Sequence, residues 1–135
     1  MFLLDTNVIS ELKRSRPHGA VRAWIASTPS SALFVSAVSI GEIQTGIEIT
    51  RGRDATRAAE IEQWLERIIQ TFQICDFDAA SSRIWAKLMQ KTTTDHVLDA
   101  MIAATAMARG MTVATRNVRD FKSFGVAVLN PFAAT

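Results

Sequence analysis

Cysteine is almost absent from this sequence, because its 135 residues include only one, Cys75. A single cysteine excludes an internal disulfide framework and fits a reducing compartment. Apolar runs are also short: none approaches the ~18 residues of a membrane span. The N-terminus lacks the basic segment and the small-residue cleavage pattern of a secretory signal. We therefore expect a cytoplasmic protein with no membrane attachment.

Excess charge and zinc-ligand patterns are lacking as well. The net charge of +2 is too small to indicate nucleic-acid binding by itself. His18 and His96 are isolated from each other and from Cys75, so no spacing suggests a zinc site. Hydrophobic residues make up 48% of the chain and charged residues 21%, which are ordinary values for a globular protein. The sequence therefore predicts one folded domain over residues 1–135.

Strand-like and helix-like patterns alternate along the whole chain. The predicted strands cover residues 2–4, 33–36, 72–75, 111–114 and 126–129. The predicted helices cover residues 6–14, 18–27, 38–51, 55–72, 79–91 and 95–109, with a turn or short helix at 117–121. This alternation favours an α/β fold in which a central parallel sheet of about five strands has helices on both faces.

Three acidic residues stand where a parallel sheet gathers functional groups. Asp5 ends the first strand, and Glu42 lies early in the helix after the second strand. Asp99 adjoins an apolar run in which an unpaired carboxylate would be costly to bury. Since the carboxyl ends of parallel strands share one edge, these acids are expected to converge there, near Asn117 and Asp120. The alternative is that they only cap helices, which for Asp5 is an equally good interpretation of its own stretch.

The other acids have simpler interpretations. Glu11 and Glu48 are expected on solvated helix faces, and Asp54, Asp78 and Asp95 at helix starts as caps. Thr6 is predicted to cap the first helix, and Ser36 or Ser39 the helix after the second strand.

A cluster of carboxylates needs cations, because like charges raise one another's pKa. Oxygen ligands suit a hard divalent ion such as Mg²⁺ or Mn²⁺. Such an ion can activate a water and stabilise a leaving oxygen, which suits phosphodiester hydrolysis. Basic residues that could meet a phosphate backbone follow the first strand and the fourth: Lys13, Arg14, Arg16, Arg116 and Arg119.

Four sequence stretches occur in one order and together span the chain. They are LLDTNVISEL at 3–12, VSAVSIGEIQTGI at 35–47, LDAMIAATAMARGMTVATRNVRDF at 98–121 and VLNPF at 128–132. In these stretches the chain resembles the PIN-domain ribonucleases, in particular the VapC and FitB-like toxins of bacterial toxin–antitoxin modules. The resemblance implies a PIN fold, a Mg²⁺- or Mn²⁺-dependent endoribonuclease, a homodimer and inhibition by a small VapB- or FitA-like antitoxin. It also implies assembly of that complex on operator DNA.

The resemblance assigns roles to particular positions. Asp5, Glu42 and Asp99 match the family's best-defined acids and would hold the metal. A fourth family position, usually Asp, falls at Asn117, which adds no charge to a second metal site, and Asp120 is the candidate that would compensate. Six further residues are assigned either to support of the metal site or to binding of the RNA. Thr6, Asn7 and Thr115 would support the site, while Arg116, Lys13 and Arg14 would contact the RNA.

The mechanism implied is hydrolysis by a metal-activated water, leaving a 5′-phosphate and a 3′-hydroxyl without a side-chain nucleophile. Two other classes compete with this hypothesis. An aspartate phosphatase would need Asp where Asn7 stands, and a receiver domain a lysine where Arg116 stands. A binding module without turnover would use the acids only as caps. DNA or flap structures remain alternative substrates. Trp64 and the helix over residues 38–49 could line a groove for an antitoxin helix.

Overall fold

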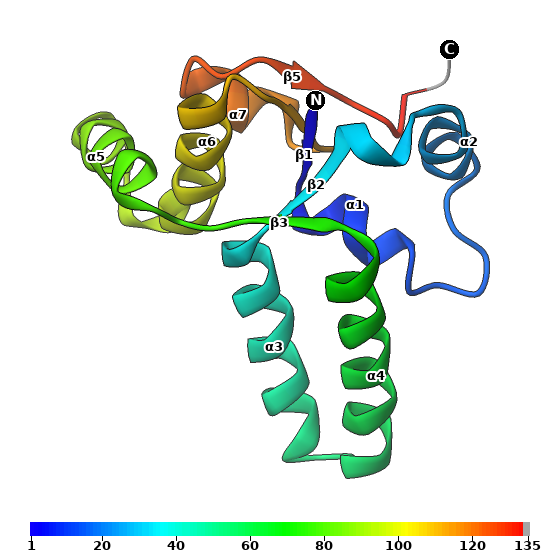
Figure 1. Cartoon of the computed structure of the whole chain (residues 1–135). Helices are drawn as coiled ribbons and strands as arrows, with labels where there is room; N and C mark the ends of the chain where they lie inside the picture. Colours follow the sequence, from blue (N-terminus) through cyan, green and yellow to red (C-terminus); the bar gives the residue numbers. More distant parts are fainter. Residues whose placement is uncertain (134–135) are drawn as a thin grey trace.

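A five-stranded parallel sheet forms the centre of the protein, and the computed structural model describes residues 1–133 of it (Figure 1). The strands are β1 (Phe2–Leu4), β2 (Leu33–Ser36), β3 (Gln73–Cys75), β4 (Thr112–Ala114) and β5 (Val128–Leu129). Their order is β3-β2-β1-β4-β5, and all four pairings are parallel. The predicted α/β class with a parallel sheet is confirmed.

Helices connect the strands and cover both faces of the sheet (Figure 1). The α-helices are α1 (Thr6–Glu11), α2 (Gly19–Ser27), α3 (Ala37–Arg51), α4 (Ala55–Thr71), α5 (Ala79–Leu88), α6 (Val97–Arg109) and α7 (Val118–Ser123). Short 3-10 helices are η1 (Ser30–Ala32), η2 (Met89–Lys91) and η3 (Thr94–His96). Among the described residues, no helix is long and apolar enough to cross a membrane.

The hydrophobic core has two parts, one on each face of the sheet. Leu4 belongs to the cluster with α1, α2, α3 and α4, whereas its neighbour Leu3 belongs to the cluster with α6 and α7. Both side chains are fully buried. Successive side chains of a strand point to opposite faces, so a fully apolar strand is stable only when helices cover both.

The order in which strands are added to the sheet reverses between β1 and β4, although the two strands are parallel. From β1 it builds outward through β2 to β3, and it then crosses to β4 and β5 on the other side. In an open parallel sheet this switch point leaves a crevice at the carboxyl ends of the two strands. The residues directly after β1 and β4 are Asp5 and Thr115, so both lie at that crevice.

Helix caps agree with the sequence at most positions but not at the first helix. Asp54, Asp78 and Ser36 accept backbone N–H groups as N-caps of α4, α5 and α3. The prediction that Thr6 caps the first helix is wrong, because the Asp5 carboxylate accepts the Thr6 N–H itself. The same acid therefore ends the strand and begins the helix.

Element boundaries differ from prediction mainly at helix ends. The first helix ends at Glu11 rather than at residue 14. Asp95 does not begin the sixth helix, since it lies in η3 and α6 starts at Val97. The last strand is shorter than predicted, and the predicted domain end lies outside the described residues. Gly110 does end α6, with the positive φ of 65° that favours glycine.

Candidate active site

Asp5 is the most constrained residue of the predicted site. It is 3% exposed, and its backbone N–H donates to Ala114 on β4 at 2.9 Å. Its Oδ1 accepts the Thr6 N–H at 2.8 Å, and its Oδ2 accepts the buried Thr115 hydroxyl at 2.7 Å. Asn7 Nδ2 lies 3.2 Å from Oδ2 as a further donor. Donors from both sides of the crevice thus fix the carboxylate in one orientation.

Glu42 reaches the same crevice from the second turn of α3. The Thr6 hydroxyl donates to Glu42 Oε1 at 3.1 Å and lies 2.9 Å from the hydroxyl of the buried Ser39. Thr6 therefore contacts Asp5 through its backbone and Glu42 through its side chain. This single residue links two of the three predicted acids.

Asp99 forms a cluster with two residues of neighbouring segments. Ligand atoms of His96, Asp99 and Asp120 lie within 4.8 Å of one another. The place of His96 beside these two carboxylates was not predicted from the sequence, although its spacing of three from Asp99 at a helix start was a usable signal. α7 brings the Asp120 carboxylate to Asp99, and compensation by Asp120 for Asn117 stays a prediction.

The three predicted acids are electrostatically strained. Burial raises the pKa of Asp5 from 3.8 to about 6, despite the hydrogen bonds from Thr115 and Thr6, and the charges of Asp99 and Glu42 add to the rise. Burial also raises the pKa of Glu42, as does the charge of Asp99. For Asp99, burial and the charge of Asp120 raise the pKa. The charges of Asp99 and Glu42 raise the pKa of Asp5, which indicates that these carboxylates lie near one another, whereas the group within 4.8 Å among the described residues is His96, Asp99 and Asp120.

Asn117 and Asn7 occupy different parts of the crevice. Asn117 begins α7, and its backbone N–H donates to the Thr115 hydroxyl at 2.9 Å. Its side chain makes no capping hydrogen bond. Asn7 bridges the two sides of the crevice, since it donates to Asp5 and accepts the backbone N–H of Arg116 at 3.3 Å.

The three predicted substrate-binding cations have different surroundings. Lys13 Nζ lies 5.8 Å from the centre of the Trp64 ring. Arg14 pairs with Glu11 at 3.3 Å. The Arg116 guanidinium carbon lies 3.9 Å from the centre of the Phe132 ring. Contact of any of them with RNA stays a prediction.

Glu11 contradicts its predicted place on a solvated helix face. It is 7% exposed, and its Oε1 accepts the backbone N–H of His18 at 2.9 Å. That hydrogen bond, together with the one from Arg14, lowers the pKa of Glu11. The carboxylate therefore stays ionised while it fastens the segment between α1 and α2.

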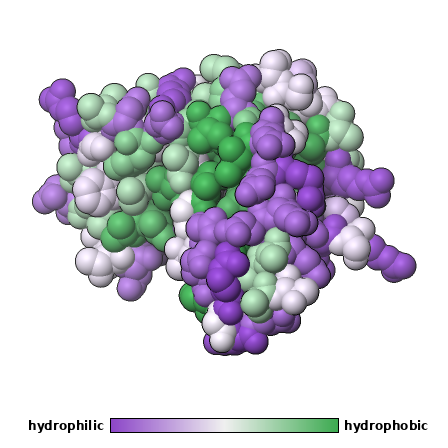
Figure 2. Space-filling model, turned by 60° about the horizontal axis from the view of Figure 1, so that its bottom comes forward, coloured by the Kyte–Doolittle hydropathy of each residue, from purple (hydrophilic) through white to green (hydrophobic). Residues whose placement is uncertain are grey.

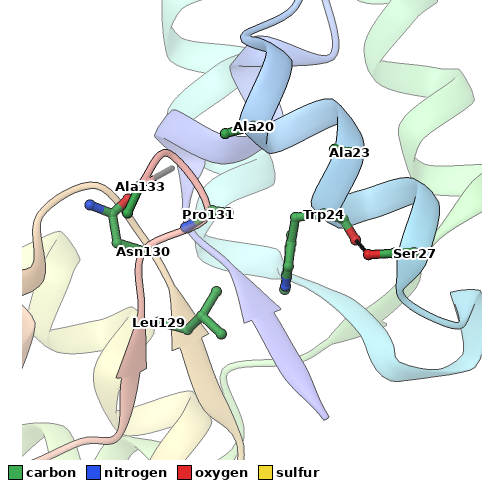
Figure 3. A pocket seen from close by; sticks show the side chains of 8 residues that line it. All are labelled: Ala20, Ala23, Trp24, Ser27, Leu129, Asn130, Pro131 and Ala133. Carbon is green, nitrogen blue, oxygen red and sulfur yellow. Dashed lines mark hydrogen bonds between the residues drawn. The ribbon is translucent and has the colours of Figure 1, made fainter. Parts of the chain in front are cut away.

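Among the described residues, a groove adjoins Glu42 and a second cavity lies beside α2. A cavity of about 280 Å³ between α1, α3 and α4, which we call the α1–α3–α4 groove, is lined by Thr6 and Glu42 and, farther along, by Gly46, Ile61 and Trp64. A second cavity, of about 550 Å³, lies between α2 and the segment after β5, with Trp24 and Leu129 on its walls (Figure 3). Of the described residues that line the second cavity, none is acidic, so it is not the candidate active site.

The donor set suits a hard cation. Asp5, Glu42, Asp99 and Asp120 offer carboxylate oxygens, which are the ligands that divalent ions such as Mg²⁺ prefer. The raised pKa values point the same way, because a bound cation would relieve the repulsion that produces part of them. Among the described residues, no cluster of cysteine and histidine offers an alternative soft site.

A parallel α/β sheet with acids gathered at its switch point defines the class of protein. The PIN domain family model matches residues 2–126, so the chain belongs to the PIN domain family. The family inferred from the sequence motifs is thereby confirmed.

Particular relatives are similar over nearly the whole chain. The chain is 36% identical to VapC ribonuclease Y4jK of Sinorhizobium fredii, an alignment that covers 98% of each protein. It is 33% identical to Toxin FitB of Neisseria gonorrhoeae, covering 98% of this chain and 99% of that one. The solved structure of FitAB bound to an IR36 DNA fragment superposes with a TM-score of 0.86 at 32% identity, covering 100% of this chain and 98% of that chain.

Proposed function

We propose that this protein is a divalent-metal-dependent endoribonuclease that acts as the toxin of a toxin–antitoxin module. The observation that carries the proposal is the buried Asp5 carboxylate at the switch point of a PIN-domain sheet, linked through Thr6 to Glu42 and close enough to Asp99 for that charge to raise its pKa. Similarity to a VapC ribonuclease and to a FitB toxin over almost the full length supports the choice of activity.

Asp5, Asp99 and Glu42 would hold the cation, Mg²⁺ or Mn²⁺, with Asp120 and His96 beside Asp99. When bound, such an ion supplies an activated water and neutralises charge on the phosphodiester. Because Asp120 stands next to Asp99, the loss of a carboxylate at Asn117 leaves an acid on that side of the site.

The remaining residues would orient the metal-binding carboxylates and neutralise the substrate phosphate. Thr115, Asn7 and the Thr6 N–H hold the Asp5 carboxylate, while the Thr6 hydroxyl holds Glu42. With its oxygens fixed, Asp5 needs little reorganisation as charge develops on the phosphate. In this proposal the exposed Arg116, whose backbone N–H donates to Asn7 beside Asp5, neutralises the substrate phosphate. No serine, cysteine or histidine nucleophile is needed.

The direct test is cleavage of a structured RNA by the purified, antitoxin-free protein, with Mg²⁺, Mn²⁺ or EDTA. We expect cleavage with a divalent ion, none in EDTA, and loss of cleavage in an Asp99→Asn variant that keeps the native melting temperature. A DNA oligonucleotide of the same sequence tests the choice of nucleic acid. Metal-independent cleavage, or an active Asp99→Asn protein, would contradict the proposal. A folded protein that neither binds metal nor cuts RNA would favour a binding module.

The α1–α3–α4 groove is our proposed docking site for an antitoxin helix. Its walls carry the apolar side chains Ile43, Ile47, Ile61 and Trp64, which suit the apolar face of an amphipathic helix. Thr6 and Glu42 line the groove too, so a bound segment would lie against the acidic site. This position explains how a small partner could block catalysis. The prediction that Trp64 and the helix over residues 38–49 line a groove agrees with this cavity.

Filling the groove should separate inhibition from catalysis. Gly46 lies in α3 on the groove, and a Cβ added there meets no atom within 4 Å. We expect Gly46→Phe to weaken binding of the module's antitoxin by at least about tenfold, since the ring occupies the helix site. RNA cleavage by the free toxin should persist. Binding is measured by titration calorimetry.

The matched control is Gly41→Phe. Gly41 lies in the same helix with equally free space, but outside the groove. Both changes replace a helical glycine with the same side chain, so their effects on helix propensity cancel. Equal loss of antitoxin affinity in the two variants would argue against the groove.

A second copy of the chain is a further proposed partner. Figure 2, which brings the tips of α3 and α4 forward, shows hydrophobic surface at the centre of this face with hydrophilic surface around it. Exposed apolar side chains on α3, α4 and α6 include Ile49, Ile69 and Leu98, of which Ile49 is 59% exposed. Burial in a homodimer would remove such surface from water. With operator DNA, we propose that toxin and antitoxin form the larger complex, as the solved FitAB–DNA structure suggests.

A further inference from the structure

The turn that follows β5 contacts the rim of the candidate active site. It contains Asn130, Pro131 and Phe132, and Asn130 Oδ1 accepts the Phe132 backbone N–H at 3.0 Å. This turn lies beyond residues 2–126, the part of the chain that the family model matches. Figure 3 shows Asn130 and Pro131 where the chain leaves β5 and turns beside α2. The proposed catalytic residues do not include any residue of this turn.

Phe132 contacts two residues from other parts of the chain. Its ring centre is 3.9 Å from the guanidinium carbon of Arg116. It also meets the His18 ring edge-to-face, with 5.3 Å between centroids. The His18 Nδ1 accepts the Ala20 N–H at 3.2 Å, and the His18 backbone N–H donates to the buried Glu11. The Phe132 ring therefore packs on a residue that is itself hydrogen-bonded and carries an arginine over its face.

We infer that Phe132 is a positioning residue whose ring holds the Arg116 guanidinium at the rim of the acidic site, where Arg116 binds a phosphate of the RNA. The inference rests on the proposed ribonuclease function and deepens it. A guanidinium that lies over an aromatic ring uses its face for the contact and keeps its N–H groups for a phosphate. Within residues 1–133, the N–H groups of the Arg116 guanidinium make no hydrogen bond or ion pair with a protein acceptor; only the backbone N–H of Arg116 donates, to Asn7.

Charge explains why the position of this arginine matters. The crevice carries several carboxylates, so an RNA phosphate that approaches it meets repulsion unless cations stand beside it. Arg14 is already paired with Glu11, and Lys13 lies over Trp64. Arg116 is tied to the crevice by its backbone N–H, which donates to Asn7, the neighbour of Asp5. A flexible arginine loses rotamer freedom when it binds phosphate, and a ring that holds it beforehand reduces that loss.

The test measures RNA binding without turnover. A fluorescein-labelled RNA hairpin is titrated in EDTA and followed by fluorescence anisotropy. We expect Phe132→Leu to weaken binding about two- to fivefold, because the Arg116 side chain then loses on binding the rotamer freedom that the ring had already restricted. Phe132→Tyr keeps the ring and should bind within twofold of wild type. In the Arg116→Ala background, Phe132→Leu should have no further effect, because Phe132 acts through Arg116.

Phe77→Leu is the matched control. Phe77 is another partly buried phenylalanine, packed edge-to-face on Trp85 at 6.3 Å, away from Arg116. This variant loses the same ring and should bind RNA as wild type does. Melting temperatures of all variants show whether Phe132→Leu stays folded. The exposed Arg116→Ala variant gives an independent measurement, and its salt dependence of binding should fall by about one phosphate contact.

Several results would overturn the inference. These are wild-type binding by Arg116→Ala, wild-type binding by a folded Phe132→Leu, an equal effect of Phe132→Leu with and without Arg116, or no RNA binding by the wild-type protein in EDTA. Failure of the ribonuclease proposal looks different. RNA that binds with the expected dependence on Phe132, but is never cut with Mg²⁺ or Mn²⁺, contradicts the activity and supports the role of Phe132.

Discussion

Replacing Asp5 with asparagine should abolish RNA cleavage and leave the fold intact. Asn keeps the shape and one acceptor oxygen, so the cap on the Thr6 N–H can persist. It removes the negative charge that, in our proposal, holds the cation. We expect activity to fall at least about 100-fold, more than for a residue that only supports a metal ligand. Initial rates on a labelled RNA in Mg²⁺ or Mn²⁺ give the measurement.

A matched control for this variant is Asp54→Asn. Asp54 also caps a helix through its carboxylate, here the Arg57 N–H at 3.0 Å, but at the start of α4 and outside the candidate site. Both variants lose one charge at a cap, and only Asp5→Asn should lose cleavage. If Asp5→Asn cut RNA at the rate of Asp54→Asn, the cap would be the whole role of Asp5 and the proposed mechanism would be wrong.

Metal-free protein should lose stability as pH rises from about 4 to about 7. Folding raises the pKa of Asp5 from 3.8 to about 6, so the native state holds a proton that the unfolded chain has released. This contribution to the free energy of unfolding is fully present below pH ~4 and is lost as pH rises through the folded pKa. A shift of this size corresponds to roughly 3 kcal/mol for Asp5. Glu42 and Asp99, whose pKa values are also raised, act in the same direction.

Comparison with Asp5→Asn isolates the contribution of one residue. Urea unfolding at pH 4, 5.5 and 7 in EDTA gives the free energy of unfolding of each protein. Between pH 4 and 7 the free energy of unfolding of the variant should rise relative to that of wild type by up to about 3 kcal/mol, since Asn cannot ionise. Curves that stay parallel across this range would show that Asp5 is not strained in the folded protein.

Divalent metal should offset the loss of stability that wild type shows relative to Asp5→Asn at pH 7. At pH 7 a bound cation stabilises the ionised carboxylates, so Mg²⁺ or Mn²⁺ is expected to raise the melting temperature of wild type more than that of Asp5→Asn. At pH 4, where protons compete for the carboxylates, the effect of the metal should be small.

The sequence by itself determined the order of elements and most helix caps. Short-range patterns decide these features: an apolar run of three or four residues makes a buried strand, and an Asp or Ser before a helical pattern caps it. The sequence also placed Asp5 directly after a strand and Glu42 early in the helix that follows a strand, which is enough to predict an acidic edge once the sheet is parallel. The family followed from motifs that span the chain, and the family match confirms it.

Only the tertiary structure decided which side chains meet. Asp5 and Thr115 are separated by 110 positions, and they touch because β1 and β4 are neighbours in the sheet. The packing of α7 beside α6 likewise brings Asp120 to Asp99, whereas His96 is only three positions away from Asp99 along the chain. Strand order depends on long-range packing, which no local pattern of apolar and polar residues encodes.

Burial of polar groups was the other feature beyond the sequence. Glu11 has the spacing of a surface residue, yet the chain after α1 folds back and the backbone N–H of His18 donates to the buried carboxylate. Arg116 was expected among the basic residues that meet a phosphate backbone, and its place over Phe132 depends on a turn that comes after the last strand. Both contacts form only when a loop or turn folds back on the chain, and the periodic pattern of apolar residues does not encode that folding.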